Sequence, residues 1–205
     1  MTAYLLVPLL AAVAFACGSL VYKRAFSEGA GVVHAVVLNN VVLAVAFLPL
    51  FLLESRPVPW DLAHLPAITA TTFVAGHLLN VLSLRVGDVS VATPLLGAKV
   101  VMVALIGRLA FDWPVSPEQF GAAGLATTGV LVMGAADWRG GRHTLPTILL
   151  ALGCAGCFAI TDVLIQLWAE PFGTFNFLPM LFLALAGESL VLLPVFGTSA
   201  LRAPM

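Results

Sequence analysis

Long uninterrupted apolar runs alternate along the chain with short stretches of polar and turn-forming residues. A helix needs about 20 mostly apolar residues to cross the hydrocarbon core of a bilayer. Membrane β-strands would be about 10 residues long and would alternate apolar and polar residues, which these runs do not. The pattern therefore predicts about seven transmembrane helices. They are expected at residues 4–22, 32–53, 66–84, 89–111, 119–137, 145–168 and 174–197.

Composition agrees with a chain that faces lipid. Hydrophobic residues make up 61% of the 205 residues and charged residues only 9%, whereas a soluble domain carries about 25% charged residues. The net charge of −1 provides no basic patch of the kind that binds nucleic acid. The connections are too short for a folded soluble domain, so we expect the function to reside within the helices, with membrane lipid as the surroundings.

The three cysteines do not point to a redox or metal site. Cys154 and Cys157 form a C-x-x-C motif, but it lies in an apolar helical run and no second ligand pair accompanies it. A glycine-rich phosphate-binding loop is also missing from the sequence. We therefore expect neither a cofactor nor a metal, and no self-contained ATP-driven pump.

Two parts of the chain resemble each other weakly. The stretch AFACGSLVYKRAF, from residue 14, aligns with CFAITDVLIQLWA, from residue 157, which pairs Phe15 with Phe158 and Ser19 with Asp162. LPLF and LPVF recur further along at a similar offset. One period contains five helices, so the second copy must enter the membrane from the opposite side. Such inverted repeats are typical of secondary transporters, whose substrate site lies at the repeat interface.

The repeat predicts how the chain is divided. Residues 1–138 form the first five-helix repeat, and residues 139–205 contain the first two helices of a second, incomplete repeat. Two full copies would make ten helices in about 290 residues, so we expect about three helices to be absent. The expected fold is an all-α integral membrane protein, a polytopic helical bundle built on inverted five-helix repeats.

Residues 84–134 carry a more specific resemblance. LRVGDVSVATPLLGAKVVMVAL (84–105) and FDWPVSPEQFGAAGLATTGVLVMG (111–134) resemble the third-to-fifth-helix region of EamA-type members of the drug/metabolite transporter superfamily. The similar features include a loop at Gly87-Asp88, a proline (Pro94) in the fourth helix and an acidic residue after it. Asp112 stands where the family more often has glutamate.

The resemblance implies a fold, a function and a location. Such transporters have ten helices in two inverted five-helix repeats, and they export or exchange amino acids, metabolites or drugs. The expected location is the plasma (inner) membrane of a bacterium, and the expected partner is a small-molecule substrate.

Ionisable residues within the predicted spans are the first candidates for a substrate site. Lys99 lies near the middle of the fourth span, where a charge costs about 2.5–3.5 kcal/mol on insertion scales and needs a partner. Glu188 and Asp162 are the candidate counter-charges. A carboxylate beside a lysine can exchange a proton when a substrate arrives. The alternative is a structural ion pair that holds helices together.

Uncharged polar residues within the spans are weaker candidates, because such groups often form interhelical hydrogen bonds of about 0.6 kcal/mol. His77 and Asn80 share one helix face at i, i+3 spacing, and His77 is a candidate proton carrier. The candidates for lining the cavity are Asn39, Asn40, His77, Asn80, Ser19 and Thr93, and Pro94 is a candidate helix kink.

Three functions compete at this stage. The first is a carrier that moves a small organic solute by alternating access, as a secondary exporter or exchanger. The second is an intramembrane enzyme, which we do not expect because the H-E-x-x-H and G-x-S-x-G motifs are missing. The third is a non-transporting assembly or accessory protein. The sequence leaves open coupling to protons, and association with a second copy or a complementing chain.

Overall fold

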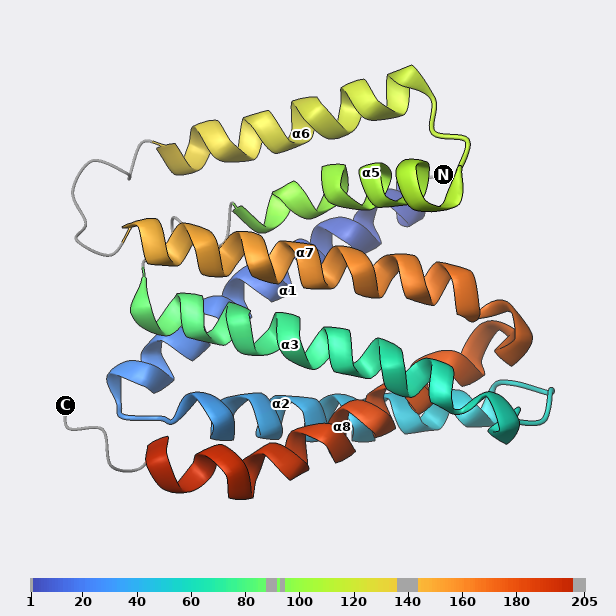
Figure 1. The fold of residues 1–205 in the computed structure, drawn as a ribbon, viewed down its shortest axis with the longest axis horizontal. Coiled ribbons are helices and arrows are strands. Elements are labelled where there is room, and N and C mark those ends of the chain that lie inside the picture. The colour runs from blue at the N-terminus through green and yellow to red at the C-terminus, as the bar shows by residue number, and fades with distance from the viewer. Residues whose placement is uncertain (1, 88–91, 93–94, 136–143, 201–205) are drawn as a thin grey trace.

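The computed structural model describes residues 2–87, 92, 95–135 and 144–200, and within these ranges the chain forms helices and no β-strand. The helices lie roughly side by side, and α1 crosses behind the others in the view of Figure 1. The α-helices are α1 (Thr2–Ser27), α2 (Val32–Phe47), α3 (His64–Val86), α5 (Lys99–Phe111), α6 (Pro117–Ala135), α7 (Thr144–Trp168) and α8 (Gly173–Ala200). The 3-10 helices are η1 (Leu48–Leu52), η2 (Trp60–Leu62), η3 (Leu96–Ala98) and η4 (Glu170–Phe172).

The all-α membrane architecture predicted from the apolar runs is confirmed. Each expected span coincides with a described helix, the fourth with η3 and α5. Four segments of the described chain are long and apolar enough to cross a membrane. They are Val32–Leu52, Trp60–Val86, Leu145–Trp168 and Phe175–Pro194. The inverted repeat and the division after residue 138 stay predictions.

Local sequence signals fix the turn between α5 and α6. Helix α5 ends at Phe111, and its C-cap residue Asp112 has a left-handed backbone (φ 51°), a conformation that aspartate tolerates better than most residues. Helix α6 begins with a capping box: the Ser116 backbone N–H donates to Gln119 Oε1 (2.8 Å), and the Gln119 backbone N–H donates to Ser116 Oγ (3.3 Å). Pro117 occupies the first helical position, where its missing N–H costs nothing. The box explains why α6 begins at residue 117 rather than 119.

Helix α3 lies at the centre of the packing, between α7 and α8, while α2 packs along α8. Small residues permit the close approach of α3 and α7. A Cβ at Gly76 would lie only 2.9 Å from the Phe158 ring. Across the same interface, the Thr72 and Thr161 hydroxyls are 2.8 Å apart and hydrogen-bonded. This interface joins the two predicted repeats.

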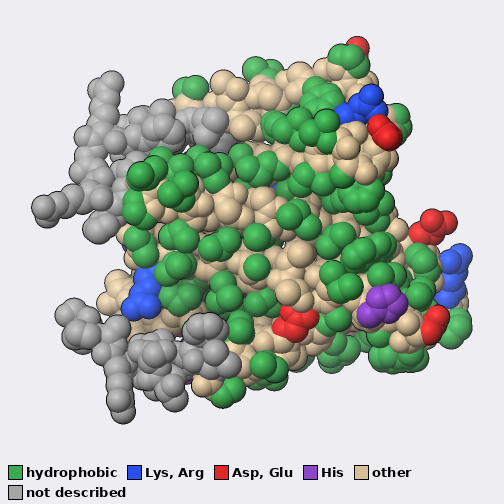
Figure 2. Space-filling view, viewed as in Figure 1, with side chains coloured by type: hydrophobic (Ala, Val, Ile, Leu, Met, Phe, Trp, Pro, Cys, Tyr) green, Lys and Arg blue, Asp and Glu red, His purple; other side chains and the backbone are tan. Residues whose placement is uncertain are grey.

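The outside of the bundle is apolar. Figure 2 shows a face covered by hydrophobic side chains, with most of the charged side chains in view towards the ends of the helices. Large residues such as Leu52, Leu109 and Leu125 are more than three-quarters exposed (87%, 80% and 76%). In water such a surface would cause aggregation. It suits a protein surrounded by acyl chains.

Candidate functional site

A cavity of about 300 Å³, here called the polar cavity, lies among α1, α2, α3 and α7. Its polar wall combines residues from three helices: Ser19, Tyr22, Asn39, His77 and Asn80. Its apolar wall is formed by Ala14, Phe15, Gly18, Leu43, Phe73 and Phe158. Phe15 and Phe158, which the predicted repeat pairs with each other, thus lie on the same cavity.

A chain of hydrogen bonds behind the polar cavity determines which nitrogen of the neutral His77 ring carries the proton. Ser189 donates to Leu185 O (2.7 Å), so Ser189 Oγ accepts from Asn40 Nδ2 (2.6 Å). Asn40 Oδ1 must then accept from His77 Nδ1–H (2.8 Å). In the neutral ring the lone pair consequently lies on Nε2, which accepts from the Tyr22 hydroxyl (3.3 Å).

The two predicted asparagines of α2 have different surroundings. Asn40 is fully buried and holds His77 and Ser189, so it connects α2, α3 and α8 rather than lining the polar cavity. Asn39, the next residue, is half-buried and lines the cavity. Consecutive helical residues point about 100° apart, which sends the two amides to different neighbours.

Two amides on the cavity wall have no hydrogen-bond partner in the part of the chain that the structure describes. Asn80 is only 6% exposed, yet within the described part of the chain its side chain makes no hydrogen bond, and the same holds for Asn39. By contrast, the buried Ser19 hydroxyl donates to Phe15 O (3.1 Å) of its own helix. Buried amides are nearly always hydrogen-bonded, so the buried Asn80 amide, unpartnered among the described residues, is available to a ligand in the polar cavity, and the half-buried Asn39 amide lines the same space.

The predicted charge pair forms, but with one of the two candidate acids. Lys99 Nζ lies 2.7 Å from Asp162 Oδ2, and the two side chains are 36% and 42% exposed. Glu188 instead accepts a hydrogen bond from Thr71 Oγ1 (3.2 Å), where α8 packs on α3. None of these three charged residues lines the polar cavity. Their role in transport stays a prediction.

Two candidates, Thr93 and Pro94, lie outside the described residues. Among the polar residues that line the cavity, Tyr22 was not predicted from the sequence, because a tyrosine near the end of an apolar run is typical of the membrane interface. The spacing between Tyr22 and Ser19 is a sequence signal that both residues line the same space. The two are three residues apart on one helix face, as are His77 and Asn80.

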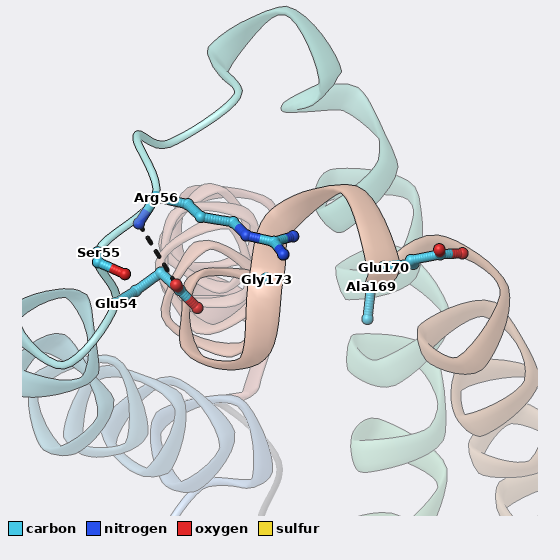
Figure 3. Close-up of a pocket in the computed structure, with 6 residues that line it drawn as sticks. All are labelled: Glu54, Ser55, Arg56, Ala169, Glu170 and Gly173. Carbon is cyan, nitrogen blue, oxygen red and sulfur yellow. Dashed lines mark hydrogen bonds between the residues drawn. The ribbon is translucent and has the colours of Figure 1, made fainter.

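A second pocket, of about 570 Å³, lies where the α2–α3 connection meets the α7–α8 turn (Figure 3). The Glu54 carboxylate accepts from the Phe175 N–H (3.1 Å) at the start of α8 and from the Arg56 N–H (3.3 Å). It also lies against Gly173, where φ is +76° and a Cβ would collide with it. A carboxylate at a helix N-terminus is stabilising. We therefore interpret this contact as structural: it attaches the α2–α3 connection to the start of α8 at one end of the bundle. Ser55, Ala169 and Glu170 complete the lining.

Comparison with known proteins identifies the family of the chain. The model of the EamA-like transporter family matches residues 1–135. Neither the curated proteins nor the solved structures provide a match. The family consists of transporters rather than enzymes, and it implies membrane transport of small solutes. The chain belongs to the EamA-like transporter family.

Proposed function

We propose that the chain moves a small organic solute across a bacterial plasma membrane by alternating access, as a secondary exporter or exchanger, and that the solute binds in the polar cavity. The observation that carries the proposal is the pair of amides, Asn39 and Asn80, that have no hydrogen-bond partner among the described residues and lie beside His77 within membrane-spanning helices. Family membership supports the same function.

The energetics of polar groups in a membrane support this location. An amide buried without a hydrogen bond costs about 1–3 kcal/mol, and polar residues within membrane helices are typical of substrate pathways. His77 is held in one orientation because Asn40 accepts from its Nδ1–H. His77 Nε2 accepts from the Tyr22 hydroxyl (3.3 Å), so the groups in the cavity that have no partner among the described residues are the amides of Asn39 and Asn80.

The Lys99–Asp162 ion pair joins two helices that would move relative to each other during alternating access. Lys99 belongs to α5 and Asp162 to α7, and these helices lie in different predicted repeats. Alternating access requires one repeat to rock against the other around the site. We propose that the Lys99–Asp162 ion pair breaks and re-forms during that movement. Coupling of transport to protons, through this pair or through His77, stays a prediction.

The proposal is tested with the purified protein in liposomes loaded with radiolabelled neutral, anionic or cationic solutes. Wild-type vesicles are expected to exchange at least one solute faster than protein-free vesicles. Asn80→Leu should slow that flux by about tenfold, because losing a ligand hydrogen bond costs about 1.4 kcal/mol.

The control is Thr128→Val on α6, where the hydroxyl donates only to Gly124 O of its own helix (2.8 Å). This variant should transport like wild type. The proposal is wrong if the solutes show no protein-dependent flux, or if Asn80→Leu transports as fast as the control.

A further inference from the structure

An apolar groove of about 510 Å³ lies between α1 and α2, next to the polar cavity. The two spaces share three lining residues, Gly18, Tyr22 and Asn39. The other residues of the groove are Val21, Ala25, Ala30, His34, Ala35, Leu38 and Val42. The groove and the polar cavity therefore meet along one wall.

The groove faces the side of the bundle that acyl chains would cover. Val21, Leu38 and Val42, which flank it, are 68%, 67% and 56% exposed. Gly18 lies where the two spaces meet, and a Cβ there would have no atom within 4 Å. A side chain added at Gly18 would therefore project into open space at this junction between α1 and α2.

The polar cavity specifies the chemistry of what would enter. Asn80, 94% buried and unpartnered within the described residues, offers an amide donor and acceptor, and Asn39 offers the same at the shared wall. The described lining residues carry no formal charge when His77 is neutral. A charged group placed there would be buried without a counter-charge, which costs several kcal/mol. An uncharged polar group with hydroxyl or amide character fits this wall.

We propose that the polar cavity and the groove together bind one amphipathic molecule with a neutral, hydrogen-bonding head and a single hydrocarbon chain. The head binds Asn39 and Asn80, and the chain lies between α1 and α2. The inference rests on the proposed function and narrows its substrate class. It also makes the bilayer the compartment from which the solute enters.

The driving force must come from the head. A hydrocarbon chain gains little by leaving lipid for an apolar groove, because lipid tails are as apolar as the groove. By contrast, acyl chains cannot form the hydrogen bonds that a polar head would make with the amides of Asn39 and Asn80. Changes at the head site should therefore affect binding more than changes in chain length.

Photolabelling tests the inference on the full chain in lipid nanodiscs. The probe is a monoacylglycerol with a diazirine on its hydrocarbon chain, and labelled positions are mapped by mass spectrometry. Labelling is expected on α1 and α2 within residues 14–43, and excess unlabelled monoacylglycerol should compete with it. A fatty acid and an alkylammonium of the same chain length should not compete.

Two variants decide whether this labelling reports a site. Gly18→Leu fills the junction of groove and cavity, and Asn80→Leu removes the head contact. Each should reduce competable labelling by about tenfold, which corresponds to about 1.4 kcal/mol. Gly121→Leu on α6, where a Cβ also meets nothing within 4 Å, should label like wild type.

Labelling that cannot be competed, or that persists in Gly18→Leu, would mean ordinary lipid contact and would overturn the inference. Equal competition by the fatty acid or the alkylammonium would contradict the inference that the head group is neutral. Photolabelling requires no transport, so its failure is distinguishable from failure of the flux assay, which tests the proposed function alone.

Discussion

Replacing Lys99 with methionine is expected to abolish transport and to destabilise the protein, whereas Lys99→Met combined with Asp162→Asn should recover stability without recovering transport. The reason is the 2.7 Å contact between Lys99 Nζ and Asp162 Oδ2. Removing the lysine leaves a carboxylate without a counter-charge in a membrane-spanning helix. For a fully buried pair the loss is about 3–5 kcal/mol, and the partial exposure of these side chains makes it smaller here.

The measurements are solute flux in liposomes, the amount of protein in the membrane and the midpoint of thermal unfolding. Arg108→Met is the matched control, because Arg108 of α5 and its C-cap residue Asp112 form an exposed pair (3.5 Å), and such pairs contribute about 0–1 kcal/mol. Unchanged transport in Lys99→Met would show that the Lys99–Asp162 ion pair is not required for transport.

Gly76→Leu is expected to have the largest effect on the fold. The substitution places a branched side chain where even a Cβ would lie 2.9 Å from the Phe158 ring and 3.1 Å from Cys157 Cβ. Helices α3 and α7 would have to separate along their shared interface, at a cost of about 3 kcal/mol for an overpacked site. The variant should unfold at a lower temperature and lose the hydrogen bond between Thr72 and Thr161.

Gly156→Leu provides the control for this variant. Gly156 lies on α7 next to Cys157, but a Cβ there meets nothing within 4 Å. Thermal unfolding followed by circular dichroism compares the two variants. Equal losses would show that a leucine in these helices, and not the close approach at Gly76, causes the destabilisation.

The membrane fold was predictable because the length of an apolar run determines what it can span. The seven predicted runs overlap the described helices in the same order, and four described segments are long and apolar enough to cross a membrane. The need of Lys99 for a partner was equally predictable, since an isolated intramembrane charge is too costly. Which acid provides the partner was not, because that depends on how α5 and α8 lie around α3 and α7.

The cavity was harder to predict, because adjacent residues can have unlike surroundings. Asn39 and Asn40 look equivalent in sequence, yet one lines the polar cavity and the other supports His77 from behind. The position of each amide is set by the neighbouring helix that it faces. Tyr22 shows the opposite case: its ring extends from the end of an expected span to His77, 55 residues away along the chain, and no local pattern specifies that contact.

Alternating access requires a polar cavity that opens to both sides of the membrane in turn. The direct test is Ser19→Cys in a chain whose Cys17, Cys154 and Cys157 are replaced by alanine. Ser19 lines the polar cavity, and a thiol is close to a hydroxyl in size. Ser189→Cys is the control, since Ser189 is fully buried and does not line the cavity.

The measurement is the rate at which a membrane-impermeant maleimide, applied to one face of oriented vesicles at a time, modifies the Ser19→Cys thiol. The account predicts modification from either face, and none of Ser189→Cys from either. Modification of Ser19→Cys from one face only, or from neither, would contradict alternating access through the polar cavity.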